Sequence, residues 1–229
     1  MTMRFQKELE KLKKRILFLG AMVEERVRMA IKAVESRDEK LARRIIEADR
    51  EIDENEVEVE EECLKLLALH QPVAVDLRFL TAVIKINNDL ERIGDEAVNI
   101  AERVAYIATR PPVKVQFNYT LMAEKTESMV KSSLDCLVNL DVDLAYQVCL
   151  KDDEIDDINR EIYVKLTDAI RQNPERVGYL TNLLSVSRHL ERIADHATNI
   201  AEEVIYMIEG EIHRHRMDEY KYKPVDYAH

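Results

Sequence analysis

DLERIGDEAVNIAERVAYI at residues 89–107 recurs as HLERIADHATNIAEEVIYM at residues 189–207. Twelve of these nineteen positions are identical, whereas average composition would give about one or two matches by chance. A second pair of segments agrees, because residues 41–53 resemble residues 144–156 in the same order. Similarity at a fixed spacing indicates a repeated structural unit, so the sequence predicts an internal duplication of roughly 100 residues.

Composition and turn signals predict a fold made of helices. The chain contains only four Gly and five Pro among 229 residues, too few for the many turns of a β-sandwich or barrel. Short joints between long helices make neighbours antiparallel, which predicts an all-α fold of two tandem three-helix bundles. The six helices are expected over residues 4–35, 38–70, 74–108, 115–139, 142–172 and 175–209.

Helix-breaking residues place the boundaries of the two halves. We expect the first bundle at residues 1–110, the second at 111–210 and a polar, irregular tail at 211–229, with Pro111-Pro112 as the separator. Ser36 and Glu39 have the spacing of a capping box, which predicts the start of the second helix. Asn173 followed by a proline predicts a capped start for the sixth helix.

Net charge and cysteine usage limit the classes of function. The formal net charge is −11, whereas nucleic-acid binding normally requires a basic face, so we expect no nucleic-acid partner. The three cysteines form no C-x-x-C pair and are expected to be reduced, buried thiols. No signal-peptide pattern or apolar run of about 20 residues occurs. The protein is therefore predicted to be cytoplasmic, without direct membrane insertion.

Acidic residues occupy helix positions where the periodicity expects apolar ones. On a helical wheel, Asp49 and Asp53 fall within the same inward arc as Leu64. Asp152 and Asp156 repeat this arrangement in the fifth predicted helix. The third and sixth predicted helices each carry a polar stripe beside their apolar face. These stripes comprise Glu91, Asp95, Asn99 and Glu102, and their counterparts Glu191, Asp195, Asn199 and Glu202.

Two interpretations of these acids remain open. An inward, unpaired carboxylate costs several kcal/mol, so either the bundle is open there or Arg and Lys side chains pair with the acids. Alternatively, oxygens from two helices hold a divalent or ferric cation, since hard cations favour oxygen ligands. Recurrence in both halves favours the metal interpretation. Arg92 and Arg192 are interpreted as structural counter-charges in preference to phosphate contacts. His189 and His196 have no counterpart in the first half and are left out of the predicted ligands.

These segments resemble the PhoU family. The resemblance extends from FQKELEKLKKRILFLGAMVEERV near the start, through QPVAVDLRFL, to GEIHRHR in the tail. The repeated E/D-x-x-x-D motif carries it most specifically, as Glu91-x-x-x-Asp95 and Glu191-x-x-x-Asp195. The resemblance implies the tandem three-helix-bundle fold, carboxylate-bound metals and a regulatory role without catalysis. Iron, magnesium, manganese and calcium are all compatible with such sites.

The resemblance also implies a function in phosphate homeostasis. It implies a negative regulator of phosphate uptake and starvation signalling, which connects the ATPase subunit of a phosphate ABC transporter with a sensor histidine kinase. We further predict that the protein forms a homo-oligomer, and that this oligomer is a homodimer. The alternative function is a carboxylate-bridged di-metal (iron) enzyme of the helical-bundle type, or a metal-storage protein. Such enzyme sites typically need Glu-x-x-His pairs, and none of the six histidines follows a Glu by three positions.

Overall fold

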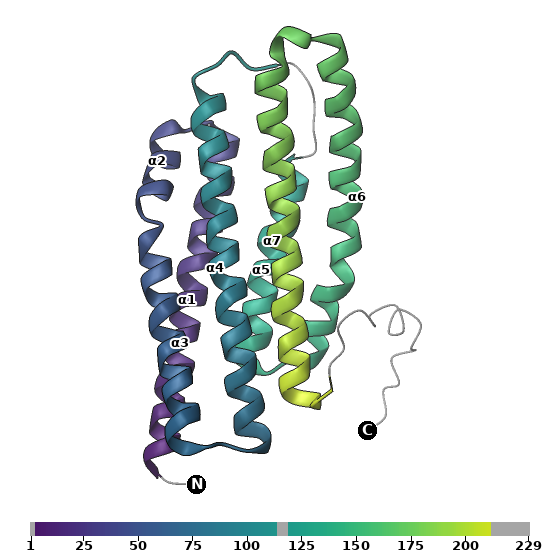
Figure 1. The fold of residues 1–229 in the computed structure, drawn as a ribbon. Helices are drawn as coiled ribbons and strands as arrows, with labels where there is room; N and C mark the ends of the chain where they lie inside the picture. Colours follow the sequence, from purple (N-terminus) through teal and green to yellow (C-terminus); the bar gives the residue numbers. More distant parts are fainter. Residues whose placement is uncertain (1–2, 114–118, 212–229) are drawn as a thin grey trace.

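The computed structural model describes residues 3–113 and 119–211, which form long helices packed side by side (Figure 1). The helices of the first half are α1 (Met3–Ser36), α2 (Glu39–Glu47), α3 (Arg50–His70) and α4 (Ala74–Ala108). Those of the second half are α5 (Tyr119–Asn139), α6 (Val142–Gln172), a short 3-10 helix η1 (Pro174–Arg176) and α7 (Val177–Glu209). No strand occurs in these described segments. The prediction of two tandem three-helix bundles is confirmed.

The prediction of one continuous helix over residues 38–70 is wrong, because the structure divides this segment into two helices. Residues 48 and 49 form a turn that separates α2 from α3. At Ala48 the backbone angles are φ −96° and ψ 8°, outside the range of a regular helix. The corresponding helix of the second half, α6, runs without interruption from Val142 to Gln172. The two halves therefore differ in the helix that carries the first pair of acids.

Two predicted helix starts are also corrected. Asp38 caps α2, since its side chain accepts hydrogen bonds from the backbone N–H groups of Lys40 and Leu41, whereas the Ser36 hydroxyl donates back to Lys32 O. The predicted capping box therefore does not form. The Asn173 side chain donates to a carbonyl of the preceding helix, and α7 begins after η1. The residues from 115 to 118 and the tail beyond 211 lie outside the described part of the chain.

Helices α4 and α7 lie side by side and antiparallel at the centre of the molecule (Figure 1). Their apolar faces are fully buried, with Leu90 and Ile100 in α4 and Leu190 and Ile200 in α7 at 0–1% exposure. Helices α1 and α5 meet on the other side of this pair. Gly20 permits that approach, since a Cβ there would lie 2.7 Å from a Leu134 methyl group. The two halves thus share one continuous core.

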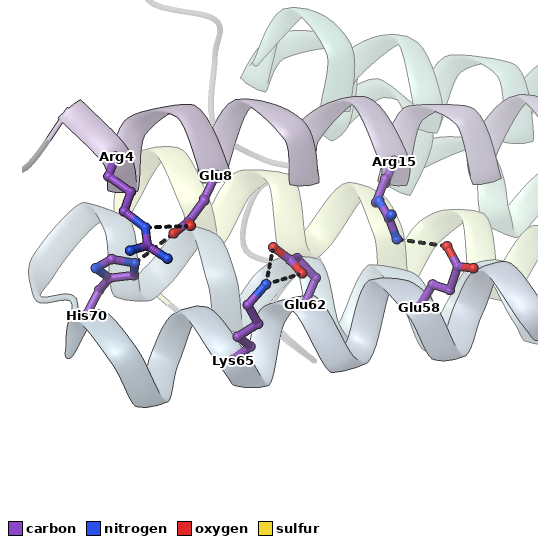
Figure 2. A network of polar contacts seen from close by, with 7 residues as sticks. All are labelled: Arg4, Glu8, Arg15, Glu58, Glu62, Lys65 and His70. Carbon is purple, nitrogen blue, oxygen red and sulfur yellow. Dashed lines mark hydrogen bonds and ion pairs between the residues drawn. The ribbon is translucent and has the colours of Figure 1, made fainter.

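Ion pairs line the seam between α1 and α3 (Figure 2). Arg15 Nη1 in α1 lies 2.8 Å from Glu58 Oε2 in α3. At the end of α3, His70 Nε2 lies 2.8 Å from Glu8 Oε2, and Glu8 Oε1 accepts a hydrogen bond from Arg4 Nε at 3.1 Å. The Arg15–Glu58 pair is exposed, where a single ion pair contributes little stability, whereas Glu8 and His70 are partly buried.

The three cysteines are buried and free, as predicted. Burial, with nearby acids as a smaller cause, raises the pKa of the Cys63 and Cys136 thiols to about 12, so both are protonated and unreactive at neutral pH. No helix within residues 3–113 and 119–211 has the length and apolar character needed to cross a bilayer.

The helical wheel misplaced one apolar residue of α3. Leu64 is 53% exposed, while Leu66, two residues further along the same helix, is completely buried. Leu64 lies at the edge of the arc that the wheel assigned to the core, whereas Ile52 and Cys63, nearer the other edge, are buried as predicted.

Leu66→Ala should therefore lower the free energy of unfolding by about 2–5 kcal/mol, because it leaves a cavity in the core. Leu64→Ala on the same helix is the matched control and should change it by less than about 0.5 kcal/mol. Urea unfolding followed by circular dichroism measures both. Equal losses for the two variants would show that α3 is rotated differently from the structure.

Candidate metal centre

Three carboxylates of the first half converge where α3 meets α4. Asp49 precedes α3, Asp53 lies in its first turn and Asp95 lies in the middle of α4. One oxygen from each lies within 4.8 Å of the others. Gly94 allows the two helices to come this close, since a Cβ there would lie 3.1 Å from the Ile52 Cδ1 atom. Asp53 follows Ile52 in the sequence and Asp95 follows Gly94, so this close contact also brings the two carboxylates together.

Crowding of like charges perturbs this group. Desolvation, followed by the charges of Asp53 and Asp95, raises the pKa of Asp49, while Arg26 acts in the opposite direction. The pKa of Asp95 is raised by desolvation and by Asp53. Glu91, one turn before Asp95, also has a raised pKa, because of desolvation and then Asp95. The arrangement therefore resists full ionisation and would be stabilised by an added positive charge.

One oxygen atom in this cluster has no partner. Asp49 Oδ1 is buried and accepts no hydrogen bond from the described part of the chain. A buried carboxylate oxygen is normally hydrogen-bonded or coordinated to a cation. The set of Asp49, Asp53 and Asp95 supplies only oxygen ligands, which suits hard cations such as Mg²⁺, Ca²⁺ or Mn²⁺. The residues present thus fit a bound cation.

The acids lie nearer to solvent than the wheel predicted. Asp49 and Glu91 are partly buried, but Asp53 is exposed, in contrast to the predicted inward position. Exposure of one ligand leaves the cluster open to water, which lowers the cost of holding several carboxylates together. It also provides a path by which an ion can enter.

The equivalent acids of the second half lie between α6 and α7. Desolvation is the largest cause that raises the pKa of both Asp152 and Asp195 to about 6. Asp195 and Asp156 add to the shift at Asp152, and Glu191 and Asp156 add to the shift at Asp195. The Thr198 hydroxyl donates to Asp152 Oδ1 at 3.4 Å and partly counters its shift. These residues form a second group of interacting acids.

An open hollow adjoins this second group. It has a volume of about 990 Å³, and its walls include Asp152, Asp195, Asn199 and Glu202, four of the residues predicted as ligands. Asn199 Nδ2 also donates to Asp89 Oδ1 at 3.1 Å, so its amide already has a partner from α4.

Two predicted ligands of the first half point elsewhere. Asn99 Nδ2 contacts Glu96 Oε2 at 3.5 Å, and Glu102 Oε2 pairs with Arg103 at 2.9 Å. The structure therefore brings Asp49, Asp53 and Asp95 together with Glu91 beside them, and leaves Asn99 and Glu102 outside this group.

Sequence reasoning missed a polar network between the halves. Glu96 in α4 is 3% exposed, and it lies 2.6 Å from His189 Nδ1 and 2.9 Å from Arg192 Nη1 of α7. The mirrored pair joins Asp89 Oδ1 of α4 to His196 Nδ1 of α7 at 2.9 Å.

A signal for this network was present in the sequence. The two histidines occupy the positions that Asp89 and Glu96 occupy in the other copy. When the two equivalent helices pack antiparallel, the acid at each of these positions meets the histidine at the other position. Glu96 therefore meets His189, and Asp89 meets His196. The structure also gives Arg192 a role as counter-charge, as predicted.

A family comparison agrees with this duplicated geometry. The family model described as the PhoU domain matches the chain twice, over residues 16–104 and 119–204. The chain belongs to the PhoU family. Both matches span the helices that carry the acid clusters, from α1 to α4 and from α5 to α7.

Similar proteins cover almost the whole chain. A phosphate-specific transport system accessory protein PhoU homolog of Clostridium acetobutylicum is 37% identical over 207 residues, covering 90% of this chain and 94% of the relative. The corresponding homolog of Aquifex aeolicus is 39% identical over 214 residues, covering 93% and 97%.

Two solved structures share the fold. The crystal structure of PhoU from Pseudomonas aeruginosa has a TM-score of 0.87 at 34% identity, covering 90% of this chain and all of that one. The crystal structure of the phosphate transport system regulatory protein PhoU from Streptococcus pneumoniae has a TM-score of 0.81 at 30% identity, covering 91% and 98%.

The raised pKa of Asp152 predicts a pH-dependent effect on stability. A carboxyl whose pKa is higher in the folded state destabilises the metal-free fold once it ionises, and this cost disappears as the pH falls through about 6. Asp152→Asn should therefore raise the melting temperature of chelator-treated protein at pH 7.5 by about 2–4 °C, corresponding to about 1 kcal/mol. The gain should shrink to nothing between about pH 6 and pH 4.

Differential scanning calorimetry across this pH range measures the effect. Asp157→Asn, on the same helix but in an exposed pair with Arg160, is the control and should leave the melting temperature nearly unchanged. A lower melting temperature for Asp152→Asn at pH 7.5 would contradict the crowding of charges described above.

Proposed function

We propose that this protein is a cytoplasmic, metal-binding negative regulator of phosphate uptake and of phosphate-starvation signalling. In this proposal it is a helical adaptor, a homodimer that connects the ATPase subunit of a phosphate ABC transporter with a sensor histidine kinase. Membership of the PhoU family, whose relatives are described as accessory proteins of a phosphate-specific transport system, supports the role in phosphate transport. The duplicated acid clusters support the metal.

The observation that carries the metal proposal is the convergence of Asp49, Asp53 and Asp95 around a buried oxygen without a partner. A bound cation would supply the positive charge that these acids lack. Asp53 and Asp95 would hold it between α3 and α4, and their equivalents Asp156 and Asp195 would do so between α6 and α7. The cation would thereby join the outer helix of each half to the central pair.

The rival function, a di-metal enzyme, has less support. Enzymes of that type take Glu-x-x-His pairs from their helices. Here His189 and His196 engage Glu96 and Asp89 across the α4–α7 contact. The family relatives are described as accessory and regulatory proteins. We therefore propose that the protein acts through contacts with partners and does not catalyse a reaction.

The metal can be tested by elemental analysis and thermal melting. Protein purified without chelators should contain a divalent or ferric ion, and chelation should lower its melting temperature by several degrees. A ligand present at a hundredfold excess over its Kd stabilises the native state by about 2.7 kcal/mol. Asp95→Asn combined with Asp195→Asn should lose metal and become insensitive to chelator.

Glu61→Gln is the matched control, since it removes an exposed acid of α3 outside the cluster. It should keep its metal content and its response to chelator. If metal-containing protein melts at the same temperature with and without chelator, the stabilising role of the metal is wrong.

The regulatory part of the proposal needs a cellular measurement. Cells that carry the Asp95→Asn, Asp195→Asn protein at normal folded abundance should take up phosphate without restraint when phosphate is plentiful. Uptake of radiolabelled phosphate measures this, with wild type and Glu61→Gln as references. Normal restraint by a folded, metal-free variant would separate the two parts of the proposal, because regulation would then not depend on the metal.

A further inference from the structure

The two acid clusters differ in the helix that carries their first aspartate. Asp49 lies at the break between α2 and α3, whereas its equivalent Asp152 lies within the uninterrupted helix α6. Only the acids of the first half bring one oxygen each within 4.8 Å, among all groups of three or more such ligands in the described residues. The duplication has therefore produced two sites with different geometry.

Backbone hydrogen bonds at the break explain the position of Asp49. In a regular helix its N–H would donate to the carbonyl four residues earlier, that of Ile45. It instead reaches Ile46 O, at 3.5 Å, and Ala48 N reaches Ile45 O at 3.3 Å. The Ile45 carbonyl thereby loses its regular partner and shares the Ala48 N–H with Arg44 O, which leaves it able to accept a stronger hydrogen bond from another donor.

Arg26 of α1 supplies that donor. Its side chain is buried, and Nη1 donates to Ile45 O at 2.9 Å. A second guanidinium nitrogen, Nη2, lies 3.6 Å from Glu51 Oε2 on the other side of the break. One planar guanidinium group thus contacts both α2 and α3 and bridges the turn between them. Such a planar group with several donors is well suited to bridge two segments.

The second half has no equivalent of this side chain. At the offset that relates residues 41–53 to 144–156, Arg26 corresponds to Met129 of α5, which is completely buried. A methionine cannot donate a hydrogen bond to a carbonyl. The helix beside it, α6, continues through Asp152 with its own backbone hydrogen bonds intact. The guanidinium and the helix break therefore occur together in one half and are absent together from the other.

We propose that Arg26 is a positioning residue, which holds the broken helix so that Asp49 completes a preformed cation site that the second half lacks. This inference rests on the proposed metal binding and deepens it. The first cluster binds a single cation with little rearrangement. The second cluster, on a continuous helix beside an open hollow, must draw its side chains together first and binds the same ion more weakly.

The sign of the effect separates positioning from simple charge. Arg26 is a cation near Asp49 and lowers the pKa of that carboxyl. Through charge alone it would repel a metal ion, so its removal would tighten binding. Through positioning, its removal loosens the break and weakens binding. Loss of a group that orients a metal ligand typically lowers affinity by about 10–100-fold.

Titration with Mn²⁺, with the free ion counted by electron paramagnetic resonance, tests the inference at pH 7.5. Wild type should show two classes of site. Asp49→Asn with Asp53→Asn should remove the tighter class, and Asp152→Asn with Asp156→Asn the weaker one. Arg26→Met, which copies the residue of the second half, should weaken the tighter class about 10–100-fold and leave the weaker class unchanged.

Arg28→Met is the matched control on the same helix, because Arg28 is exposed and pairs with surface acids such as Glu24 and Glu25. It should leave both classes unchanged. Hydrogen exchange supplies a readout without metal: amides over residues 45–53 should exchange faster in Arg26→Met and as in wild type in Arg28→Met. Arg26→Lys, which keeps a donor but not the bridging geometry, should give an intermediate affinity.

Each contrary outcome has its own meaning. Unchanged or tighter binding by Arg26→Met overturns the positioning role while the proposed metal binding stands. Two wild-type sites of equal affinity overturn the difference between the halves. An equal loss at both sites in Arg26→Met and Arg26→Lys shows a general loss of folding and also overturns the inference. Failure of wild type to bind Mn²⁺ at either site removes the metal proposal itself, and this inference with it.

Discussion

The antiparallel packing of α4 against α7 is the constraint on which both acid clusters depend. These two helices lie at the centre of the molecule (Figure 1), so each packs against several others while it keeps a polar face towards solvent. The side of α4 that faces α7 carries Glu96, which is neutralised across the contact by His189 and Arg192. Glu91 and Asp95 fall on a different side of α4, beside α3, where Arg92 lies 3.7 Å from Glu91 and lowers the pKa of both acids, but desolvation and the neighbouring acids outweigh it. Their charge is therefore only partly balanced within the described part of the chain.

This division of charges explains why similar acids have opposite pKa shifts. Glu96 is deeply buried, yet the hydrogen bond and charge of His189 more than offset its desolvation and lower its pKa. Asp95, adjacent in sequence and less buried, has a raised pKa because desolvation and then the charge of Asp53 outweigh the opposing charge of Arg92. Burial alone does not decide the protonation of a carboxyl group, since the sign depends on the charges that it meets. Helix α4 thus contains one acid, Glu96, whose charge the protein neutralises, and another, Asp95, whose charge remains available to a cation.

Much of the fold could be predicted from the sequence because helical periodicity and duplication are local and repeated signals. The convergence of Asp49 and Asp53 with Asp95 could also be anticipated, since the stripes recur in both halves. The break at residues 48 and 49 could not, because apolar residues such as Ile45 and Ile52 continue the seven-residue spacing across it. Arg26 of α1 donates a hydrogen bond to Ile45 O beside the break, and no property of the second helix reveals this tertiary contact.

Small differences between the copies account for the different character of the two clusters. Gly94 lets Ile52 approach α4 within 3.1–3.3 Å of the place that a Cβ would occupy, whereas the second half has Ala194 there, with a real methyl group. Val98 of the first half is replaced by Thr198, whose hydroxyl gives Asp152 a hydrogen-bond partner that Asp49 lacks. The Ala194 methyl group occupies the position that Gly94 leaves open, and the Thr198 hydroxyl satisfies one acid of the second group within the chain. A duplicated motif with identical acidic residues can therefore hold its acids differently in the two halves, because the residues between the acids decide how closely side chains pack and which acids have partners.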